Sequence, residues 1–257
     1  EGREGTLLGC LWVSGAYQYE YARKLNFSKY EIVFDLYSAD LALFHQAYKE
    51  NKSEKIASYP KKFIYVGTPE IFGSTLKPVK ENSLIFNPST PYAISKLSFE
   101  QFLMAYQKNY GSKVIITRFS NFYGRGQLEH RLIPKVLKCI KNNLKFPIHG
   151  KGLTKRDFIF DEDFNDAFYK VLKKGKPGKI YHFSTNYYVS IKSIVEIICK
   201  SKNVKFQDIV YKVSDRKGKD KYYFLDCNKT SKELKWTPKN KLIQGLNKTI
   251  KYYDKEL

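Results

Sequence analysis

Short runs of uncharged, β-forming residues alternate along the chain with longer segments whose apolar residues recur every three or four positions. The short runs predict strands at 31–38, 62–67, 113–120, 156–160 and 179–184. The periodic segments predict helices at 42–52, 90–111, 131–143, 162–175, 190–203, 229–236 and 241–256. Because apolar strands that alternate with amphipathic helices are typical of parallel sheets, the pattern predicts an α/β fold.

The strand at 62–67 is followed at once by Thr68, Pro69 and Glu70. Gly67 and Pro69 break the strand, so a hydroxyl and a carboxylate lie just past its carboxyl end. Open α/β sheets bind their ligands at that end. The pattern therefore indicates a site here, and it raises the question of why a proline separates the two polar side chains.

Tyr92 and Lys96 are four residues apart in a predicted helix, so their side chains share one face. A phenol has a pKa near ~10, and a neighbouring ammonium favours its ionised form. Such a pair is suited to take the proton of a hydroxyl while an alcohol is oxidised. The spacing alone is weak evidence, because it recurs at Tyr48/Lys52, Tyr169/Lys173 and Tyr188/Lys192.

The setting of Tyr92 is more specific than its spacing. Ordered motifs run from residue 63 to about 252, namely GTPEIFGS, NPSTPYAISK, TRFSNFYGRGQ, LIPKVL, IHGKGLTKRDFIFDED, YHFST and KELKWTPKNKLIQGLNKTIKYY. Through them the chain resembles the extended short-chain dehydrogenase/reductase superfamily. Within it, the chain is most similar to the NAD-dependent nucleotide-sugar epimerases and dehydratases, especially the dTDP-glucose 4,6-dehydratase-like branch.

The resemblance implies a Rossmann-like parallel sheet with a smaller carboxyl-terminal α/β lobe for the substrate. It divides the chain into an incomplete NAD-binding domain at 1–125, to which 179–184 returns, and a nucleotide-sugar-binding lobe at 126–257. Family members commonly form dimers through the helix that carries the tyrosine and the lysine, so a homodimer is expected. An apolar face for it, with core packing as the alternative use, is offered by Leu97, Phe99, Phe102 and Leu103.

In that family a tightly held NAD first oxidises the sugar at C4. The resemblance implies that Tyr92 is the base for the 4-hydroxyl, that Lys96 holds the nicotinamide ribose and lowers the tyrosine pKa, and that Gly67 lies against the cofactor. Thr68 is expected to hydrogen-bond the same hydroxyl, and Glu70 matches the carboxylate that removes the C5 proton. A turn cap and a solvated charge are the alternative roles of these two residues.

The dTDP-glucose dehydratases of the family carry an aspartate at the position of Pro69, and it protonates the departing C6 hydroxyl. Proline donates no proton. Thr68 and Glu70 thus retain hydroxyl binding and base chemistry, while the leaving-group acid is absent. This departure predicts an active site that differs from the standard dehydratase one.

Only seven of the 46 cationic side chains are arginines, and a planar guanidinium binds a diphosphate in a two-point geometry that an ammonium does not reproduce. Arg156 falls on the family's nucleotide-diphosphate contact. Arg216 falls near another such contact, for which Lys221 is the alternative. Arg131 resembles a substrate contact more loosely, and a surface role stays open. Asn121 matches a family position that contacts substrate, with a turn cap as its alternative.

A formal charge of +21 suggests nucleic acid, a membrane surface or an anionic small molecule as the partner. The lysines are scattered over the whole chain and lack the interleaved aromatic or zinc motifs of nucleic-acid-binding modules, which argues against that class. No apolar run approaches the roughly 18 residues that span a bilayer. The partner that the other motifs support is a nucleotide-diphosphate sugar.

Neither the cysteines nor the histidines are spaced for a metal ion or a disulfide framework. They are Cys10, Cys139, Cys199, Cys227, His45, His130, His149 and His182. The sequence therefore predicts no metal site and a reducing, cytoplasmic setting. Asp161 and Asp163 are expected to cap the helix that follows them.

The amino-terminal segment departs from the family, in which a strand, a GxxGxxG turn and a helix bind the adenosine diphosphate of NAD. Gly2, Gly5 and Gly9 are spaced differently and follow no predicted strand. We expect a shortened or altered nucleotide half, in which Asp35 ends the second or the fourth family strand. The alternative reading of the chain is a non-catalytic or truncated homologue that binds a nucleotide sugar or a protein partner without turnover.

Overall fold

The computed structural model describes residues 11–13, 32–34, 62–215 and 220–256. Several sequence predictions fall outside the described residues, namely those for Gly2, Gly5, Gly9, Asp35, Arg216 and the helix at 42–52.

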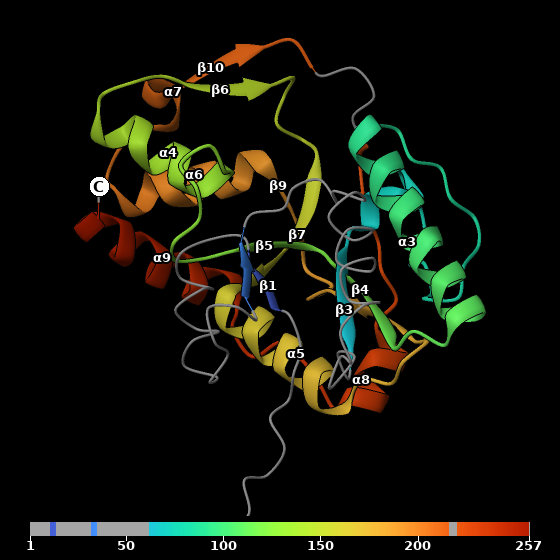
Figure 1. Ribbon diagram of the computed structural model, residues 1–257. Coiled ribbons are helices and arrows are strands. Elements are labelled where there is room, and N and C mark those ends of the chain that lie inside the picture. Colours follow the sequence, from blue (N-terminus) through green and yellow to red (C-terminus); the bar gives the residue numbers. More distant parts are fainter. Residues whose placement is uncertain (1–10, 14–31, 35–61, 216–219, 257) are drawn as a thin grey trace, which may run out of the picture.

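A parallel three-stranded sheet forms the centre of one half of the molecule (Figure 1). It consists of β3 (Phe63–Gly67), β4 (Val114–Phe119) and β8 (Ile180–Phe183), in the order β3-β4-β8. All six residues of the central strand β4 are buried, as expected for a strand that is covered on both faces.

Helices cover the two faces of this sheet. On one face α3 (Pro91–Tyr110) packs against Val114 and Ile116 of β4. On the opposite face α5 (Asp161–Lys174) packs against Ile115. Neighbouring residues of β4 therefore point to opposite faces of the sheet, as expected because the side chains of a strand alternate with a period of two.

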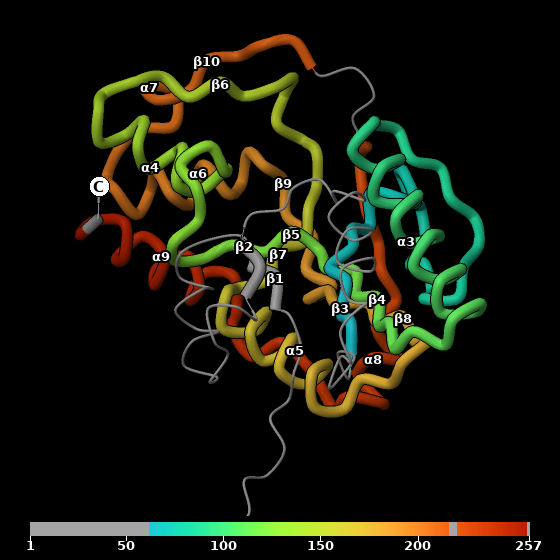
Figure 2. Tube along the Cα trace, in the orientation of Figure 1, coloured from blue at the N-terminus to red at the C-terminus, as the bar shows by residue number. Residues whose placement is uncertain are grey.

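The remaining elements build a second lobe beside the sheet (Figure 2). Its strands pair as β5-β7-β9, with β7 parallel to β5 and antiparallel to β9, and as β6-β10 in parallel. The strands are β5 (Asn121–Tyr123), β6 (Phe146–His149), β7 (Lys155–Phe160), β9 (Tyr188–Ser190) and β10 (Val210–Val213). The helices are α4 (Leu132–Lys141), α6 (Ile191–Ser201), α7 (Phe206–Ile209) and α9 (Leu242–Glu256). Their apolar faces share one core, which includes Ile133, Ile194 and Leu246.

Two short parallel strands, β1 (Leu11–Val13) and β2 (Ile32–Phe34), pair with each other, and α8 (Asn228–Leu234) packs against α5 and β8. The predicted strands and helices that fall in the described ranges are confirmed. Seven elements of three or four residues in the same ranges were missed because they are too short for a periodic pattern. They are β1, β5, β6, β9, β10, α7 and the 3₁₀ helix η1 (Pro69–Phe72). The proposed division at 125/126 stays a prediction.

A buried ion pair fastens α3 to the sheet. Glu100 of α3 and Arg118 of β4 are 0% and 1% exposed, and Nη2 of Arg118 donates to Oε2 of Glu100 at 2.6 Å. Arg118 Nη1 also lies 3.2 Å from Nε2 of His182 on β8. Because Nδ1 of His182 lies 3.1 Å from the carbonyl oxygen of Val79, Nδ1 carries the proton and Nε2 accepts from Arg118. Burial and then the charge of Arg118 lower the pKa of His182 well below its usual value, so the ring is neutral.

Gly67 makes this pair possible. It is paired with Arg118 in the sheet register, and a Cβ at this position would lie 2.3 Å from Oε1 of Glu100. Any side chain here would displace the carboxylate. The glycine in GTPE therefore has a packing reason that is independent of any cofactor.

The apolar residues of α3 that were considered for a dimer face are mainly core residues. Leu103 is 2% exposed, Leu97 packs against a cluster around Ile71, and Phe99 makes an edge contact with Tyr65 at 5.0 Å between ring centroids. These three residues therefore pack in the core, which was the alternative to a dimer face.

The ion pair yields a stability prediction. Arg118→Met leaves Glu100 buried without its partner, so we expect a loss of about 3–5 kcal/mol in the free energy of unfolding. The double variant Glu100→Leu/Arg118→Met removes both charges and should recover most of that loss. Urea unfolding of the three proteins at one pH measures the difference. A double variant less stable than the single one would contradict this account.

Candidate active site

The turn after β3 explains the proline between Thr68 and Glu70. Thr68 is the N-cap of η1, and its Oγ1 accepts a hydrogen bond from the backbone N–H of Glu70 at 3.3 Å. Pro69 occupies the first position of that helix, where no N–H is needed and a fixed φ is favourable. The turn-cap role of Thr68 is therefore real, and it holds the hydroxyl at the carboxyl end of the sheet.

Glu70 is partly buried and lies in the field of several charges. Burial raises the pKa of its carboxyl, Arg156 and Arg131 act to lower it, and Asp220 acts to raise it. Glu70 is therefore not a fully solvated charge, and its role as a base stays a prediction. The structure brings it together with two of the arginines that the sequence singled out, although they are 61 and 86 residues away along the chain.

Tyr92 and Lys96 lie in the first two turns of α3, which begins at the N-cap Thr90. The Thr90 hydroxyl accepts from the N–H of Ala93 at 3.1 Å. Tyr92 is 44% exposed, so part of the residue lies at the surface.

Lys96 is only partly accessible, and its ammonium faces β3. Nζ donates to the carbonyl oxygen of Val66 at 3.2 Å and lies 4.9 Å from the centroid of the Tyr65 ring. Burial lowers the pKa of Lys96 to about 8, and the charge of Glu100 one turn away opposes that shift. The pKa of Tyr65 is raised by burial, then by Glu100 and Tyr92, which places Tyr92 in the same neighbourhood.

Arg156 is held rigidly on β7. Its Nη1 donates to the carbonyls of Lys155 and Lys221 at 2.8 and 3.2 Å, and its Nη2 donates to the carbonyl of Asp220 at 2.9 Å. The guanidinium also lies 4.2 Å from the ring centroid of Tyr223. Burial lowers the pKa of Arg156, and nearby acidic groups, Tyr223 first, oppose the shift.

The other predicted binding residues are less constrained. Arg131 is exposed at the N-cap of α4, close enough to Glu70 to act on its pKa. Asn121 is exposed at the start of β5. Its interaction with substrate stays a prediction, as does that of Arg216, which lies outside the described residues.

The sequence did not point to Asp220 and Tyr223, which the structure places beside Arg156 and Glu70. Both are buried, at 6% and 7% exposure. They occur in the polar stretch DKYY, which is typical of a surface loop. No local pattern separates a buried aspartate from a solvated one in such a stretch.

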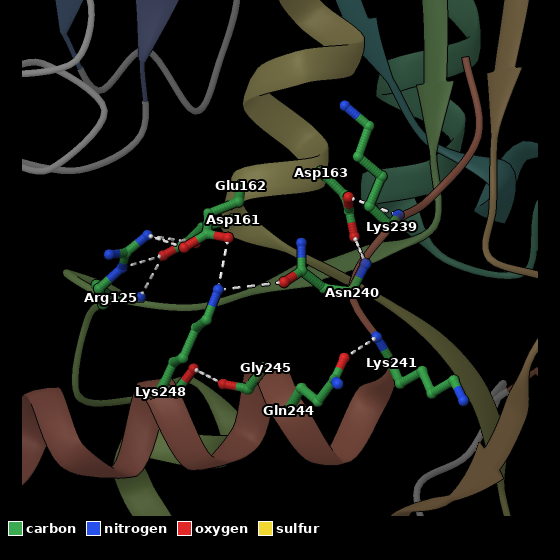
Figure 3. Close-up of polar contacts among 11 residues, drawn as sticks. Arg125, Asp161, Glu162, Asp163, Lys239, Asn240, Lys241, Gln244, Gly245 and Lys248 are labelled. Atoms are coloured by element: carbon green, nitrogen blue, oxygen red, sulfur yellow. Dashed lines mark hydrogen bonds and ion pairs between the residues drawn. The ribbon is translucent and has the colours of Figure 1, made fainter.

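A second polar cluster joins α5 to the chain before α9 (Figure 3). Asp161 accepts from Nε and the backbone N–H of Arg125, each at 2.9 Å. Asp163 accepts from the backbone N–H groups of Lys239 and Asn240 at 2.8 and 3.0 Å. The prediction that these aspartates cap α5 is wrong, since neither caps its own helix. They bind segments that are distant along the chain instead.

Within the described ranges, no group of three or more His, Cys, Asp or Glu side chains is arranged to hold a metal ion. None of the helices in that part of the chain is long and apolar enough to cross a membrane.

The fold and these motifs match known proteins. A model of the NAD dependent epimerase/dehydratase family matches residues 42–183, more than half of the chain. The chain therefore belongs to this family. Human dTDP-D-glucose 4,6-dehydratase is 38% identical over 197 residues, which cover 75% of this chain and 56% of that protein. The chain thus spans little more than half the length of this curated relative.

Solved structures give the same class. The dTDP-glucose 4,6-dehydratase DesIV from Streptomyces venezuelae, crystallised with NAD, superposes with a TM-score of 0.72 and 31% identity, covering 76% of this chain and 60% of that one. UDP-glucose 4-epimerase from Thermotoga maritima, solved with UDP-glucose, superposes with a TM-score of 0.73 and 25% identity, covering 84% and 68%. The Rossmann-like α/β class is confirmed.

The burial of Lys96 generates a pH prediction for stability. Its pKa is about 8 in the folded chain and 10.5 when unperturbed, so between these values the unfolded chain binds more protons. Stability therefore rises with pH in this window, by up to about 1.4 kcal/mol per pH unit. Lys96→Met lacks this gain. We expect the stability of the unsubstituted protein to increase relative to Lys96→Met from pH 8 to 10.

Chemical unfolding at several pH values measures this difference, and Lys108→Met, on the same helix, is the matched control for the loss of a lysine. A constant difference between the unsubstituted protein and Lys96→Met across the window would contradict the assignment.

Proposed function

We propose that this chain is an NAD-dependent nucleotide-sugar epimerase or dehydratase that acts through transient oxidation at C4 of the sugar. The proposal rests on a group of polar side chains that lies at the carboxyl end of β3. There the Thr68 hydroxyl, the partly buried Glu70 and the Lys96 ammonium are held by backbone contacts, beside Tyr92, which is partly exposed.

The donor set at this end of the sheet fits the nicotinamide half of NAD. Lys96 offers an ammonium that is fixed by Val66, Tyr92 offers a phenol, and Gly67 presents only backbone. When bound there, NAD supplies the oxidant that accepts a hydride from C4. Lys96 and Tyr92 would hold its ribose, with the backbone of Gly67 alongside.

Different side chains of the protein would carry out the separate proton transfers. Tyr92 takes the proton of the 4-hydroxyl, helped by the positive charge of Lys96, while Thr68 orients that hydroxyl. Oxidation at C4 makes the C5 proton acidic, and Glu70 removes it when the reaction proceeds to dehydration. A carboxylate whose pKa is raised by burial is a stronger base than one in water, and the charges of Arg156 and Arg131 oppose that rise and favour the ionised form.

Arg156 and Arg131 are proposed to bind the diphosphate, with Asn121 and Arg216 as further substrate contacts. Arg156 is held in place by carbonyl groups and by Tyr223, so little side-chain entropy is lost when it binds a phosphate; these contacts engage Nη1 and Nη2, so its contribution is the partly buried positive charge and the Nε donor. A guanidinium also keeps its charge despite burial.

The setting and assembly of the protein are proposed on narrower grounds. Cys139, Cys199 and Cys227 are buried free thiols, which supports a reducing, cytoplasmic environment.

A homodimer through α3 is supported by the exposure of Ile94 and Met104, at 52% and 38%. Sedimentation of a single species at the mass of one chain would exclude that dimer.

Turnover of a nucleotide sugar tests the proposed activity. Incubated with NAD and a panel that includes dTDP-glucose and UDP-glucose, the protein should convert a nucleotide sugar to a 4-keto-6-deoxy product or to the 4-epimer. Tyr92→Phe should lower kcat by about 100-fold or more, because the proton acceptor is lost, while the fold is kept. Mass spectrometry and NMR of the products measure this. Binding of nucleotide sugars without any turnover, and without NAD, would favour the non-catalytic alternative.

The proline at position 69 should affect the rate of dehydration. Because this position lacks a proton donor, any 4,6-dehydration should be slow, and Pro69→Asp should speed it by at least about tenfold. Aspartate is well tolerated in the first turn of a helix, so η1 should persist. Pro69→Ala is the matched control, since it removes the ring without adding an acid. Equal dehydration rates for the two variants would show that the acid comes from elsewhere.

A further inference from the structure

The buried carboxylate of Asp220 joins three separate parts of the molecule. Its Oδ2 accepts from the hydroxyl of Ser89 at 2.6 Å and from that of Tyr223 at 3.2 Å. Its Oδ1 accepts from the hydroxyl of Ser74 at 3.2 Å. Ser74 follows η1, Ser89 precedes α3, and Asp220 itself lies more than 130 residues further along the chain.

One side of this junction leads to Arg156. Nη2 of Arg156 donates to the backbone carbonyl of Asp220 at 2.9 Å and to the hydroxyl of Tyr223 at 3.4 Å. Tyr223 then donates to the Asp220 carboxylate. Burial first, then Glu70, raises the pKa of Tyr223, so its hydroxyl stays a donor across the physiological range. The arginine proposed for the diphosphate is therefore tied to Asp220 through two routes, directly to its backbone carbonyl and through Tyr223 to its carboxylate.

The other side leads to Tyr92. Ser89 is the residue before Thr90, the N-cap of α3, and Tyr92 is the second residue of that helix. The hydrogen bond of 2.6 Å from Ser89 to Asp220 therefore fixes the point from which the helix starts. The segment that follows Asp220 adds support, since Phe224 N–H donates to Oγ1 of Thr75 at 2.8 Å.

We propose that Asp220 is a positioning residue that sets the start of α3, and with it Tyr92, relative to Arg156. A nucleotide sugar bound by its diphosphate has to place C4 beside the phenol, so the distance between these two sites determines whether bound substrate can react. This proposal rests on the proposed function. It assigns to Asp220 no contact with substrate.

The charge of Asp220 has a separate effect on Glu70. Asp220 raises the pKa of Glu70, whereas Arg156 and Arg131 lower it, and Glu70 in turn raises the pKa of Tyr223, so these four groups lie around that carboxyl within the described part of the chain. Replacement by asparagine keeps the shape and can still bond the three hydroxyls, but it removes the charge. The pKa of Glu70 should then fall.

The test compares Ser89→Ala with Ser83→Ala in the purified full chain. Ser83 lies in the same loop, and its Oγ accepts from the N–H of Ile85 at 3.3 Å, away from Asp220. Ser89→Ala should lower kcat about ten- to 100-fold with KM nearly unchanged, the size expected for the loss of one hydrogen bond to a charged group. Ser83→Ala should leave both constants unchanged. Equal effects of the two variants, or a change in KM alone, would overturn the proposal.

Asp220 itself is tested with two variants. Asp220→Ala should lower kcat more than Ser89→Ala does, and Asp220→Asn should restore most of that loss. In Asp220→Asn the acidic limb of the kcat profile should move to lower pH, because Glu70 then ionises more easily. No rescue by asparagine, or an unmoved acidic limb, would overturn the assignment.

A measurement without substrate separates this proposal from the proposed function. Hydrogen exchange of amides 92–97 should be faster in Ser89→Ala than in Ser83→Ala, since only the former loses the anchor of α3. If the unsubstituted protein turns over no nucleotide sugar, the proposed function fails, while the exchange rates still decide whether Asp220 holds the helix. Equal exchange in the two variants would overturn that role.

Discussion

The geometry of the candidate active site depends on the buried pair of Glu100 and Arg118. It joins α3 to the central strand β4, and through His182 it reaches β8. Because Gly67 of β3 has no Cβ, the Glu100 carboxylate can also lie against β3. One ion pair thus sets the position of the helix that carries Tyr92 and Lys96 relative to all three strands. Its energetic value is modest, because desolvation offsets much of the attraction, but it specifies one arrangement of helix and sheet.

Local backbone geometry and long-range charge act together at the end of β3. Thr68 and Pro69 begin a short 3₁₀ helix, which places Glu70 where residues of the second lobe surround it. The pKa of the Glu70 carboxyl is then set by burial and by the charges of Arg156, Asp220 and Arg131. Proline serves the turn well. Proline also offers no proton to a ligand at this position, so the same residue serves the structure and limits the chemistry that we propose.

Much of the fold was predictable because long elements carry their own pattern. The apolar periodicity located α3, α4, α5, α6, α8 and α9 and the three strands of the central sheet. The short strands of the second lobe carry too few residues for a pattern, and they form only through pairing partners distant in sequence. Asp161 and Asp163 show the same limit. Their position before a helix suggested caps, whereas they bind Arg125 and the backbone at 239–240.

The sequence by itself determined the α/β class, the motifs of the family and the residues that lie next to each other on one element, such as Thr68 with Glu70 and Tyr92 with Lys96. These depend on local periodicity and on spacing along one helix or turn. Only the tertiary structure decided which charges surround Glu70, why residue 67 is glycine, and that Asp220 joins Ser89 to Tyr223. Each of those features requires burial between segments far apart in the chain, and burial is a property that no local pattern of polar residues specifies.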